Sequence, residues 1–444
     1  MDSQNGRMCI LMIPHLAHGH ISPFLELAKH LTKRSFKIYL CSTPINLASI
    51  KTRVDENDDI QLVEFHLPSS PSLPPHFHCT NGLPSHLQPL LHQTFENAAP
   101  VFMDILKEIR PNLVIYDVIP SWPAELALSL DIPAIHFSTH AASTCSLAIH
   151  FYKRVGHDFP FPEVFDSSMD RAPVSQDELK LIRNFVLCFE RSCGLVLVKS
   201  VGEVEGKYID LLSDLVEKDV IPVGQLIHDP TGNEDENLEN IMEWLDKKER
   251  SSVVFVCFGS ENYLSAEQVM EMANALETTK CHFIWVLRSP RGEEKGCLLL
   301  PEGFAERVRG FGLIVEWAPQ TKILGHSSTG AFLSHCGWSS VNESMKFGVP
   351  IIAMPLKEGD QPTNAKLALE IGVGMQVRTD SERRYKSTEI GDVIRKVLVE
   401  ESGENVRKKA KELSLRMKER GEEDLDIAAE KLMQICSKKK ETCY

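Results

Sequence analysis

Residues suited to binding a charged, hydroxyl-rich ligand are concentrated in the segment 317–361. Trp317 offers an indole that can stack on a nucleobase, and the carboxylate of Glu343 can accept two ribose hydroxyls. His335 and Ser340 lie at an expected strand-to-helix turn, where free backbone amides and the helix dipole favour phosphate. These side-chain types are the ones that a nucleotide sugar needs. The candidate binding residues of the segment are Trp317, Ala318, Gln320, His335, Trp338, Ser339, Ser340, Glu343, Asp360 and Gln361.

A second candidate pair lies far upstream and could supply a general base. His20 follows the first apolar run of the chain, and imidazole suits proton removal because its pKa lies near neutral pH. Asp117 ends another apolar run, and a carboxylate can fix the tautomer of a histidine and stabilise its cation. Both residues are expected at the carboxyl end of one sheet, where ligands of open α/β sheets bind. His15 and His18 are alternative bases.

Short apolar runs alternate with helical segments, which predicts an α/β fold. Helical periodicity covers Ser22–Arg34, with Pro23 in the first turn, and a further helix from Trp338 ends at Gly348. The proline-rich stretch Leu67–Pro84 is expected to be a long surface loop. The expected strands are Met8–Pro14, Lys37–Ser42, Ile60–His66, Leu113–Asp117, Pro133–Phe137, Val253–Phe258, His282–Leu287, Ala331–Ser334 and Pro350–Met354.

The α/β alternation stops once and then restarts, which predicts two domains in a chain of 444 residues. The acidic run His228–Asn240 has too few apolar residues to pack and is the best linker candidate. We expect a first domain of residues 1–227, a linker of residues 228–240, a second domain of residues 241–421 and a C-terminal segment of residues 422–444. Each domain should be a doubly wound parallel sheet, with a ligand cleft between the two.

Composition restricts the partners and the compartment. A net charge of −14 argues against nucleic acid or an anionic membrane as the main partner. No apolar run approaches the roughly 20 residues of a membrane span, and the N-terminus lacks the features of a signal peptide. The 12 cysteines show neither a C-x-x-C pair nor zinc-ligand spacing, so reduced thiols are expected. We therefore expect a cytoplasmic protein. We also expect it to be a monomer.

The segment 317–361 carries W-A-P-Q, H-C-G-W-S-S, E and D-Q in order, and it closely resembles the donor-binding box of the plant UDP-glycosyltransferases of family 1. The resemblance implies the GT-B architecture, two Rossmann-like domains facing a central cleft. It also implies that a last helix, about Glu422–Ser437, crosses back to the N-terminal domain. The first domain would bind an acceptor and the second a UDP-sugar. UDP-glucose would be a substrate, and neither a cofactor nor a metal ion would be required.

The resemblance also implies roles for single residues. Trp317 would stack on uracil, and Gln320 would meet the ribose or the base edge. Ser260, in F-G-S-E after an expected strand, would be a second phosphate contact. His20 and Asp117 match the His–Asp dyad of the family, which implies attack by an acceptor hydroxyl on C1 of the sugar with inversion. Trp338, Asp360 and Gln361 would face the sugar.

The segment departs from the family pattern at two places. Ser339 stands where the family usually has asparagine, so a hydroxyl replaces a side-chain amide near the phosphate. The stretch from Pro355 to Asp360 is one residue longer than usual, which leaves open whether Asp360 and Gln361 or Glu358 reach the sugar.

The expected acceptor follows from resemblance alone. The stretches STPINLASI (42–50), FHLPSSPS (65–72), EVEGKYID (203–210) and WLDKKE (244–249) resemble the sugar-on-sugar branch of the family, and ginsenoside β-1,2-glucosyltransferases in particular. This implies glucose transfer to the C3-O-glucose of a triterpene glycoside. Candidate polar contacts are Ser121, Thr139, Glu261 and Asn262, of which Thr139 is also a candidate donor contact. The alternatives are direct glucosylation of a flavonoid, phenolic or triterpene aglycone, a UDP-sugar epimerase, and an inactive nucleotide-sugar-binding protein.

Overall fold

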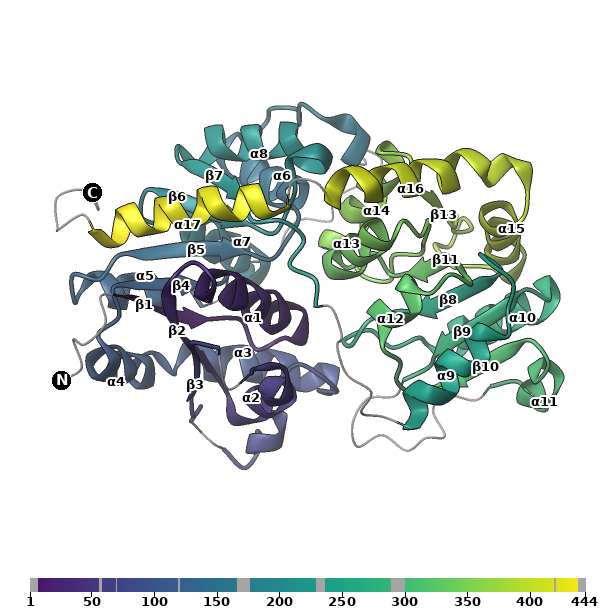
Figure 1. Ribbon diagram of the computed structural model, residues 1–444, viewed down its shortest axis with the longest axis horizontal. Coiled ribbons are helices and arrows are strands. Elements are labelled where there is room, and N and C mark those ends of the chain that lie inside the picture. The colour runs from purple at the N-terminus through teal and green to yellow at the C-terminus, as the bar shows by residue number, and fades with distance from the viewer. Residues whose placement is uncertain are drawn as a thin grey trace. The chain divides into compact units, whose positions relative to one another are not determined.

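The computed structural model describes residues 7–55, 58–68, 70–118, 120–165, 176–228, 236–288, 300–418 and 421–437. Their contacts divide the chain into two compact units (Figure 1). Unit 1 contains the described residues up to Ile227 together with those from Gly421 onward, and unit 2 runs from His228 to Lys418. Each unit is built on its own parallel sheet.

Unit 1 has a seven-stranded sheet in the order β3-β2-β1-β4-β5-β6-β7. Neighbouring strands are parallel; in the centre, for example, Ile10 of β1 pairs with Leu113 of β4. The chain order therefore reverses between β1 and β4, and in doubly wound sheets such a switch point forms a crevice at the strand ends. The strands are β1 Met8–Ile13, β2 Phe36–Ser42, β3 Ile60–Glu64, β4 Leu113–Tyr116, β5 Ala134–Ser138, β6 Leu195–Val198 and β7 Asp219–Pro222.

Helices cover both faces of this sheet because alternate strand residues are buried on opposite sides. Ile10 and Met12 of β1 belong to a core with α1 and α17, whereas Leu11 and Ile13 belong to a core with α3, α4 and α5. The helices of unit 1 are α1 His18–Thr32, α2 Pro44–Ile50, α3 Gln88–Glu96, α4 Ala99–Ile109, α5 Trp122–Leu128, α6 Ala142–Lys153, α7 Gln176–Glu190, α8 Gly202–Val216 and α17 Gly421–Ser437, with 3-10 turns η1 Lys51–Arg53, η2 Pro75–Phe77, η3 Ser85–Leu87 and η4 Pro162–Val164.

The C-terminal helix α17 packs on unit 1. Its residues Leu425, Ala428 and Leu432 are buried in the same core as β1 and α1. Arg34, just after α1, donates to the carboxylates of Glu422 at 2.8 Å and Asp426 at 2.7 Å.

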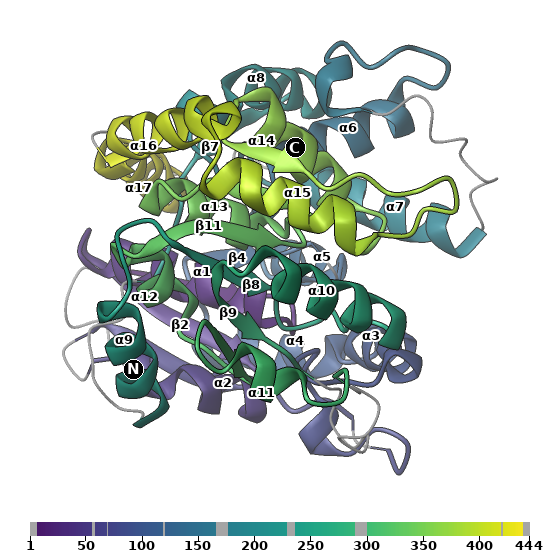
Figure 2. The same ribbon diagram turned by 90° about the vertical axis from the view of Figure 1, so that its right-hand side faces the viewer.

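Unit 2 has a six-stranded sheet in the order β10-β9-β8-β11-β12-β13, so its switch point lies between β8 and β11. Figure 2 shows helices on both faces of it. The strands are β8 Val253–Cys257, β9 His282–Val286, β10 Gly312–Val315, β11 Thr329–Ser334, β12 Ile351–Ala353 and β13 Gly374–Gln376. The helices are α9 Glu236–Asp246, α10 Ala266–Thr279, α11 Phe304–Val308, α12 Gln320–Gly325, α13 Trp338–Phe347, α14 Asp360–Glu370, α15 Ser387–Leu398 and α16 Glu404–Lys418, with the 3-10 turn η6 Glu401–Gly403.

Three expectations about local structure were wrong in part. The first helix begins at His18 rather than Ser22, because its opening residues are polar and only the later ones follow the apolar period. Helix α9 begins at Glu236, inside the expected linker, of which residues 229–235 lie outside the described part of the chain. The expected surface loop Leu67–Pro84 buries Leu73 and Leu83 in the core of unit 1. The first turns of α1 and α9 are mainly polar, so the apolar pattern of the sequence did not indicate where these helices begin. The burial of the stretch Leu67–Pro84 depends on packing against residues remote in the chain.

Within the described residues, no helix is both long enough and apolar enough to cross a membrane. The cysteines in this part of the chain form no disulfide, and most of them are buried.

Candidate active site

The switch point of unit 1 brings His20 and Asp117 together. His20 lies in the first turn of α1, directly after β1, and Asp117 directly follows β4. Nδ1 of His20 lies 2.8 Å from Oδ2 of Asp117, which is a hydrogen-bond distance. If Nδ1 carries the proton, Nε2 keeps a lone pair and can accept a proton from a substrate hydroxyl.

Asp117 is held in one orientation by the backbone. Its Oδ2 also accepts a hydrogen bond from the backbone N–H of His15 at 3.0 Å, and its Oδ1 accepts one from Val118 at 2.7 Å. The Asp117 side chain is 1% exposed and that of His20 is 18% exposed, so only the imidazole can meet a ligand. Burial alone would raise the pKa of Asp117, but the charge and hydrogen bond of His20 and the amide of His15 lower it well below its usual range. Asp117 is therefore ionised at neutral pH.

Further side chains surround the imidazole of His20. The Oγ1 of Thr139, one residue beyond β5, lies 2.8 Å from the same Nδ1 atom. The rings of His15 and His140 each approach the ring of His20 with centroids 5.3 Å apart, in edge-on geometry. His18, the other alternative base, is exposed at the start of α1. Thr139 thus contacts the candidate base of unit 1. The sequence had suggested that it contacts the sugar donor or the acceptor substrate.

In unit 2 the corresponding switch point positions His335 and Ser260. Ser260 follows β8 after Gly259, and His335 directly follows β11. The imidazole of His335 lies between two glycines: a Cβ at Gly259 would meet its Cε1 at 2.8 Å, and one at Gly337 would meet its Nε2 at 2.5 Å. Gly259 also has a φ of +78°, which favours glycine. Side chains at these two positions would displace the ring.

His335 is suited to donate a hydrogen bond rather than to supply charge. It is buried, and burial lowers its pKa to about 4 although Asp360 opposes the effect. The imidazole is therefore neutral near pH 7. It lies beside the N-terminus of α13, whose cap residue is Gly337. Free amides and the helix dipole at that end favour an anion such as a diphosphate.

One hydrogen-bonded cluster joins three of the predicted binding residues. The Nε2 of Gln320, at the start of α12, donates to Oγ of Ser340 at 3.1 Å and to Oε2 of Glu343 at 2.7 Å. Ser340 and Glu343 both belong to α13. The Glu343 carboxylate is thereby oriented and retains acceptor capacity for hydroxyl groups.

The other predicted residues of the segment differ in exposure. Trp317 follows β10 and is 55% exposed, so its indole face is available for stacking. Ala318 is partly buried beside the core of unit 2. Trp338 is 4% exposed and is therefore mainly a core residue, whereas Ser339 is buried to an intermediate degree in the first turn of α13.

The lengthened stretch before α14 engages the amide of Gln361. Its Oε1 accepts hydrogen bonds from the backbone N–H groups of Leu356 at 2.9 Å and Lys357 at 3.0 Å. Its Nε2 donates to Oδ1 of Asn262 at 3.3 Å. Gln361 thus fastens this loop to the segment after β8, while Glu358 is exposed.

Asp360 lies in the first turn of α14. It accepts a hydrogen bond from Asn364 at 3.0 Å and is only partly buried. A sugar contact by Asp360 therefore stays a prediction. It fits the structure better than a sugar contact by Gln361, because Asp360 is the more exposed of the two side chains.

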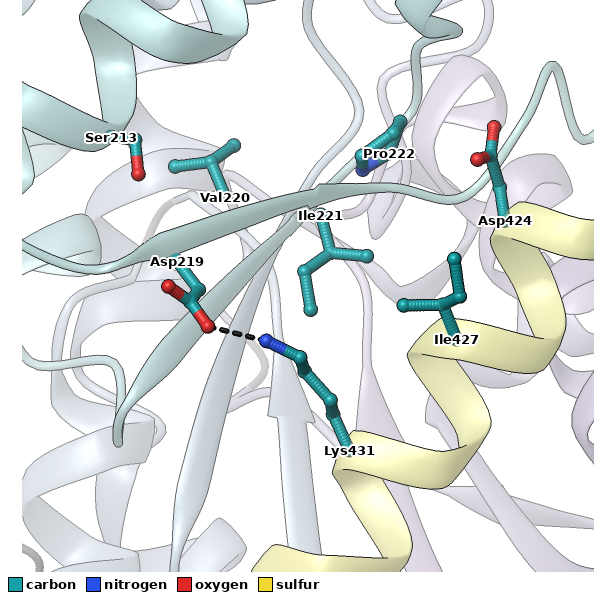
Figure 3. A pocket seen from close by; sticks show the side chains of 8 residues that line it. All are labelled: Ser213, Asp219, Val220, Ile221, Pro222, Asp424, Ile427 and Lys431. Carbon is teal, nitrogen blue, oxygen red and sulfur yellow. Dashed lines mark hydrogen bonds and ion pairs between the residues drawn. The ribbon is translucent and has the colours of Figure 1, made fainter.

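A separate groove of about 300 Å³ lies on unit 1 between β7 and α17 (Figure 3). The side chains of Asp219 and Lys431 form an ion pair in it. Its lining residues are Ser213, Asp219, Val220, Ile221, Pro222, Asp424, Ile427 and Lys431. None of them is a candidate site residue, so we assign no substrate to this groove.

Comparison with known proteins matches both units to glycosyltransferases. Residues 6–226 match the family model described as Glycosyltransferase, N-terminal domain, and residues 215–432 match the one described as UDP-glucoronosyl and UDP-glucosyl transferase. UDP-glucosyltransferase 29 of Panax ginseng is 57% identical over 444 residues, which cover 99% of this chain and 100% of that relative. This chain belongs to the UDP-glycosyltransferase family.

Two further similarities are to another plant relative and to a solved structure. The Beta-D-glucosyl crocetin beta-1,6-glucosyltransferase of Gardenia jasminoides is 44% identical, with 96% of this chain and 98% of the relative covered. The crystal structure of Glycyrrhiza uralensis UGT73P12 complexed with glycyrrhetinic acid 3-O-monoglucuronide matches with a TM-score of 0.84 at 24% identity, covering 97% of this chain and 96% of that one. The predicted GT-B class, with two doubly wound Rossmann-like domains, is confirmed, and the chain is a UDP-glycosyltransferase.

Several contacts of this UDP-glycosyltransferase were not predicted from its sequence. The approach of His140 to His20 is one, because a histidine after a strand carries no distinguishing signal of its own. The two glycines beside His335 are another, since their role depends on the distance between two loops. The roles of the predicted donor residues and of the His20–Asp117 pair stay predictions, to which the geometry adds support.

Proposed function

We propose that this UDP-glycosyltransferase transfers glucose from UDP-glucose to a sugar hydroxyl of a triterpene glycoside, with inversion at C1. The observation that carries the reaction type is the hydrogen bond between Nδ1 of His20 and the buried carboxylate of Asp117. This pairing leaves Nε2 of His20 as the proton acceptor. The finer acceptor assignment, the 1,2-linkage on a C3-O-glucose, rests on the sequence resemblance to ginsenoside glucosyltransferases. The name of the Gardenia relative specifies a glucosylated acceptor, which supports a sugar as the site of attack.

In the proposed mechanism His20 removes the proton from the acceptor hydroxyl as its oxygen attacks C1 of glucose. The C1–O bond to the diphosphate breaks on the opposite face, UDP leaves, and a β-glycoside forms. Asp117 stabilises the imidazolium that develops on His20. Because the Asp117 carboxylate is buried and already ionised, its orientation need not change during this step.

The donor is proposed to bind unit 2 through the residues around α13. Trp317 stacks on uracil, the carboxylate of Glu343 accepts the ribose hydroxyls, and Gln320 keeps that carboxylate in place. His335, Ser339 and Ser340, at the N-terminus of α13, and Ser260, in the segment after β8, donate hydrogen bonds to the diphosphate, so the proposed reaction requires neither a metal ion nor a cofactor. We also propose a cytoplasmic location, from the cysteine usage, and action as a monomer.

An acceptor panel tests the proposal. The wild-type protein and His20→Ala are supplied with UDP-glucose and, separately, a triterpene aglycone, its 3-O-monoglucoside and a flavonol. The products are analysed by mass spectrometry and by the anomeric coupling constant in NMR. We expect a β-linked disaccharide from the monoglucoside and loss of product with His20→Ala. Product from aglycones alone would establish the alternative, direct glucosylation. Epimerised UDP-sugar without a glycoside would establish the epimerase alternative, and near-normal turnover of His20→Ala would disprove the base assignment.

A further inference from the structure

A buried carboxylate outside the candidate dyad stands out in unit 1. Glu205 belongs to the stretch 203–210 and is 0% exposed. Its Oε1 accepts a hydrogen bond from the backbone N–H of Ser143 at 2.8 Å. Its Oε2 accepts from the backbone N–H of Ala142 at 3.0 Å and from Oγ of Ser200 at 2.6 Å. Every partner is a donor, so the geometry fits an ionised carboxylate.

The local backbone bends to place this side chain. Glu205 has φ −122° and ψ 16°, which is non-helical, although it lies within α8. Helices α6 and α8 pack side by side in unit 1 (Figure 1). The bend lets the carboxylate of α8 satisfy the first two amides of α6, which have no partner within their own helix. Burial raises the pKa of Glu205, and the three donors compensate for part of that effect.

The start of α6 is coupled to the imidazole of His20 through the chain itself. Only Thr139, His140 and Ala141 separate β5 from α6. Thr139 places its hydroxyl 2.8 Å from Nδ1 of His20, and the His140 ring lies edge-on to the His20 ring. A displacement of the first turn of α6 would therefore move two of the groups that touch the candidate base.

We propose that Glu205 is a positioning residue: by holding the N-terminus of α6, it sets Thr139 and His140 against His20. It acts through these residues and touches no substrate. The inference rests on the proposed role of His20 as the base.

A double-mutant cycle tests the inference. Glu205→Gln keeps the shape of the side chain but puts an NH2 group opposite a backbone N–H, which should release the start of α6. Thr139→Val removes the hydroxyl from Nδ1 of His20 and preserves its volume. We expect each single variant to lower kcat on the order of tenfold, as small misplacements at a reacting group do. The double variant should be little worse than the poorer single one, because both changes disturb the same contact.

The pH dependence of kcat/KM separates positioning from general destabilisation. Glu205→Gln and Thr139→Val should shift the acidic limb in the same direction, while affinity for UDP, measured calorimetrically, stays unchanged. Asp210→Asn is the matched control, since Asp210 is an exposed carboxylate on the same helix and should alter neither quantity. If Glu205→Gln fails to fold, Ser200→Ala, which removes one of the three donors, takes its place.

Two results would overturn the inference. One is that the losses from the two variants multiply in the double variant. The other is that the acidic limb stays where it is in the wild type while only the melting temperature falls. If His20→Ala is inactive, either result would disprove the positioning role of Glu205 and leave the proposed role of His20 as the base intact. Near-normal turnover of His20→Ala would instead remove the proposed base, and this inference with it.

Discussion

Asp117→Asn is the sharpest test of the proposed dyad, because the structure restricts how an asparagine can fit. If its oxygen takes the place of Oδ2, the NH2 group faces the backbone N–H of Val118, which donates to Oδ1 in the wild type. If the oxygen takes the place of Oδ1, the NH2 group faces both the amide of His15 and Nδ1 of His20. The second orientation moves the imidazole proton to Nε2, where the proposed mechanism needs a lone pair.

Both orientations remove the negative charge that stabilises the imidazolium. General-base catalysis contributes about 10²- to 10⁴-fold, so we expect kcat to fall by that range, which corresponds to ~3 to 5 kcal/mol of activation free energy. The smaller loss of kcat is expected if the asparagine keeps the proton of His20 on Nδ1. The larger loss is expected if the proton moves to Nε2. Lowering the pH slightly below neutrality cannot reproduce the effect of Asp117→Asn, because Asp117 stays ionised there. The pKa of Asp117 is lowered in the folded state, so its contribution to stability is present above the unfolded pKa and is lost only in strong acid.

The assay is kcat at saturating UDP-glucose and acceptor, with UDP affinity measured separately. UDP affinity should be unchanged, since the proposed UDP contacts all lie in unit 2. Asp104→Asn, which changes an exposed carboxylate of α4, should leave kcat at the wild-type value. An Asp117→Asn variant with more than roughly a tenth of wild-type kcat would refute the dyad, because removing a group essential to the base cannot cost so little.

Three further predictions concern unit 2 and acid stability. Gly259→Ala should weaken UDP affinity at least about tenfold by calorimetry, because its methyl group would displace the His335 ring and the positive φ alone costs roughly 1–2 kcal/mol; unchanged affinity would exclude His335 as a phosphate contact. Burial lowers the pKa of His136 and of His335 to about 4, whereas an imidazole in the unfolded chain titrates at about 6.5. The free energy of unfolding should therefore fall by ~3 kcal/mol per histidine as the pH is lowered from 6.5 to 4. Urea unfolding at pH 7 and pH 4.5 measures this, and equal midpoints would contradict it. Gln361→Met should weaken UDP-glucose and UDP alike, since the wild-type amide holds a loop; a loss confined to UDP-glucose would show a direct sugar contact instead.

Much of the strand pattern followed from the sequence. Short, mainly apolar runs marked the strands β1, β2, β3, β4, β5, β8, β9, β11 and β12. The run Met8–Pro14 is apolar throughout because its strand, β1, lies in the centre of the sheet with helices on both faces. The strands β6, β7, β10 and β13 are short and were not predicted. The helix from Trp338 to its C-cap at Gly348 was predicted correctly, since left-handed glycine caps are readable from local residues alone.

The candidate residues could also be predicted from the sequence, since residue type and order within the segment 317–361 carry the chemistry of a nucleotide-sugar site. The sequence likewise indicated that His20 and Asp117 follow strands and so belong at the carboxyl ends of a parallel sheet. Tertiary structure decided which atoms meet. The pairing of β1 with β4 brings Nδ1 of His20 to 2.8 Å from Asp117 across a separation of 97 residues. It also decided that Gln361 turns to its own loop and that Glu205 holds the start of α6. Such contacts depend on distances between segments remote in the chain, and local residue patterns do not encode those distances.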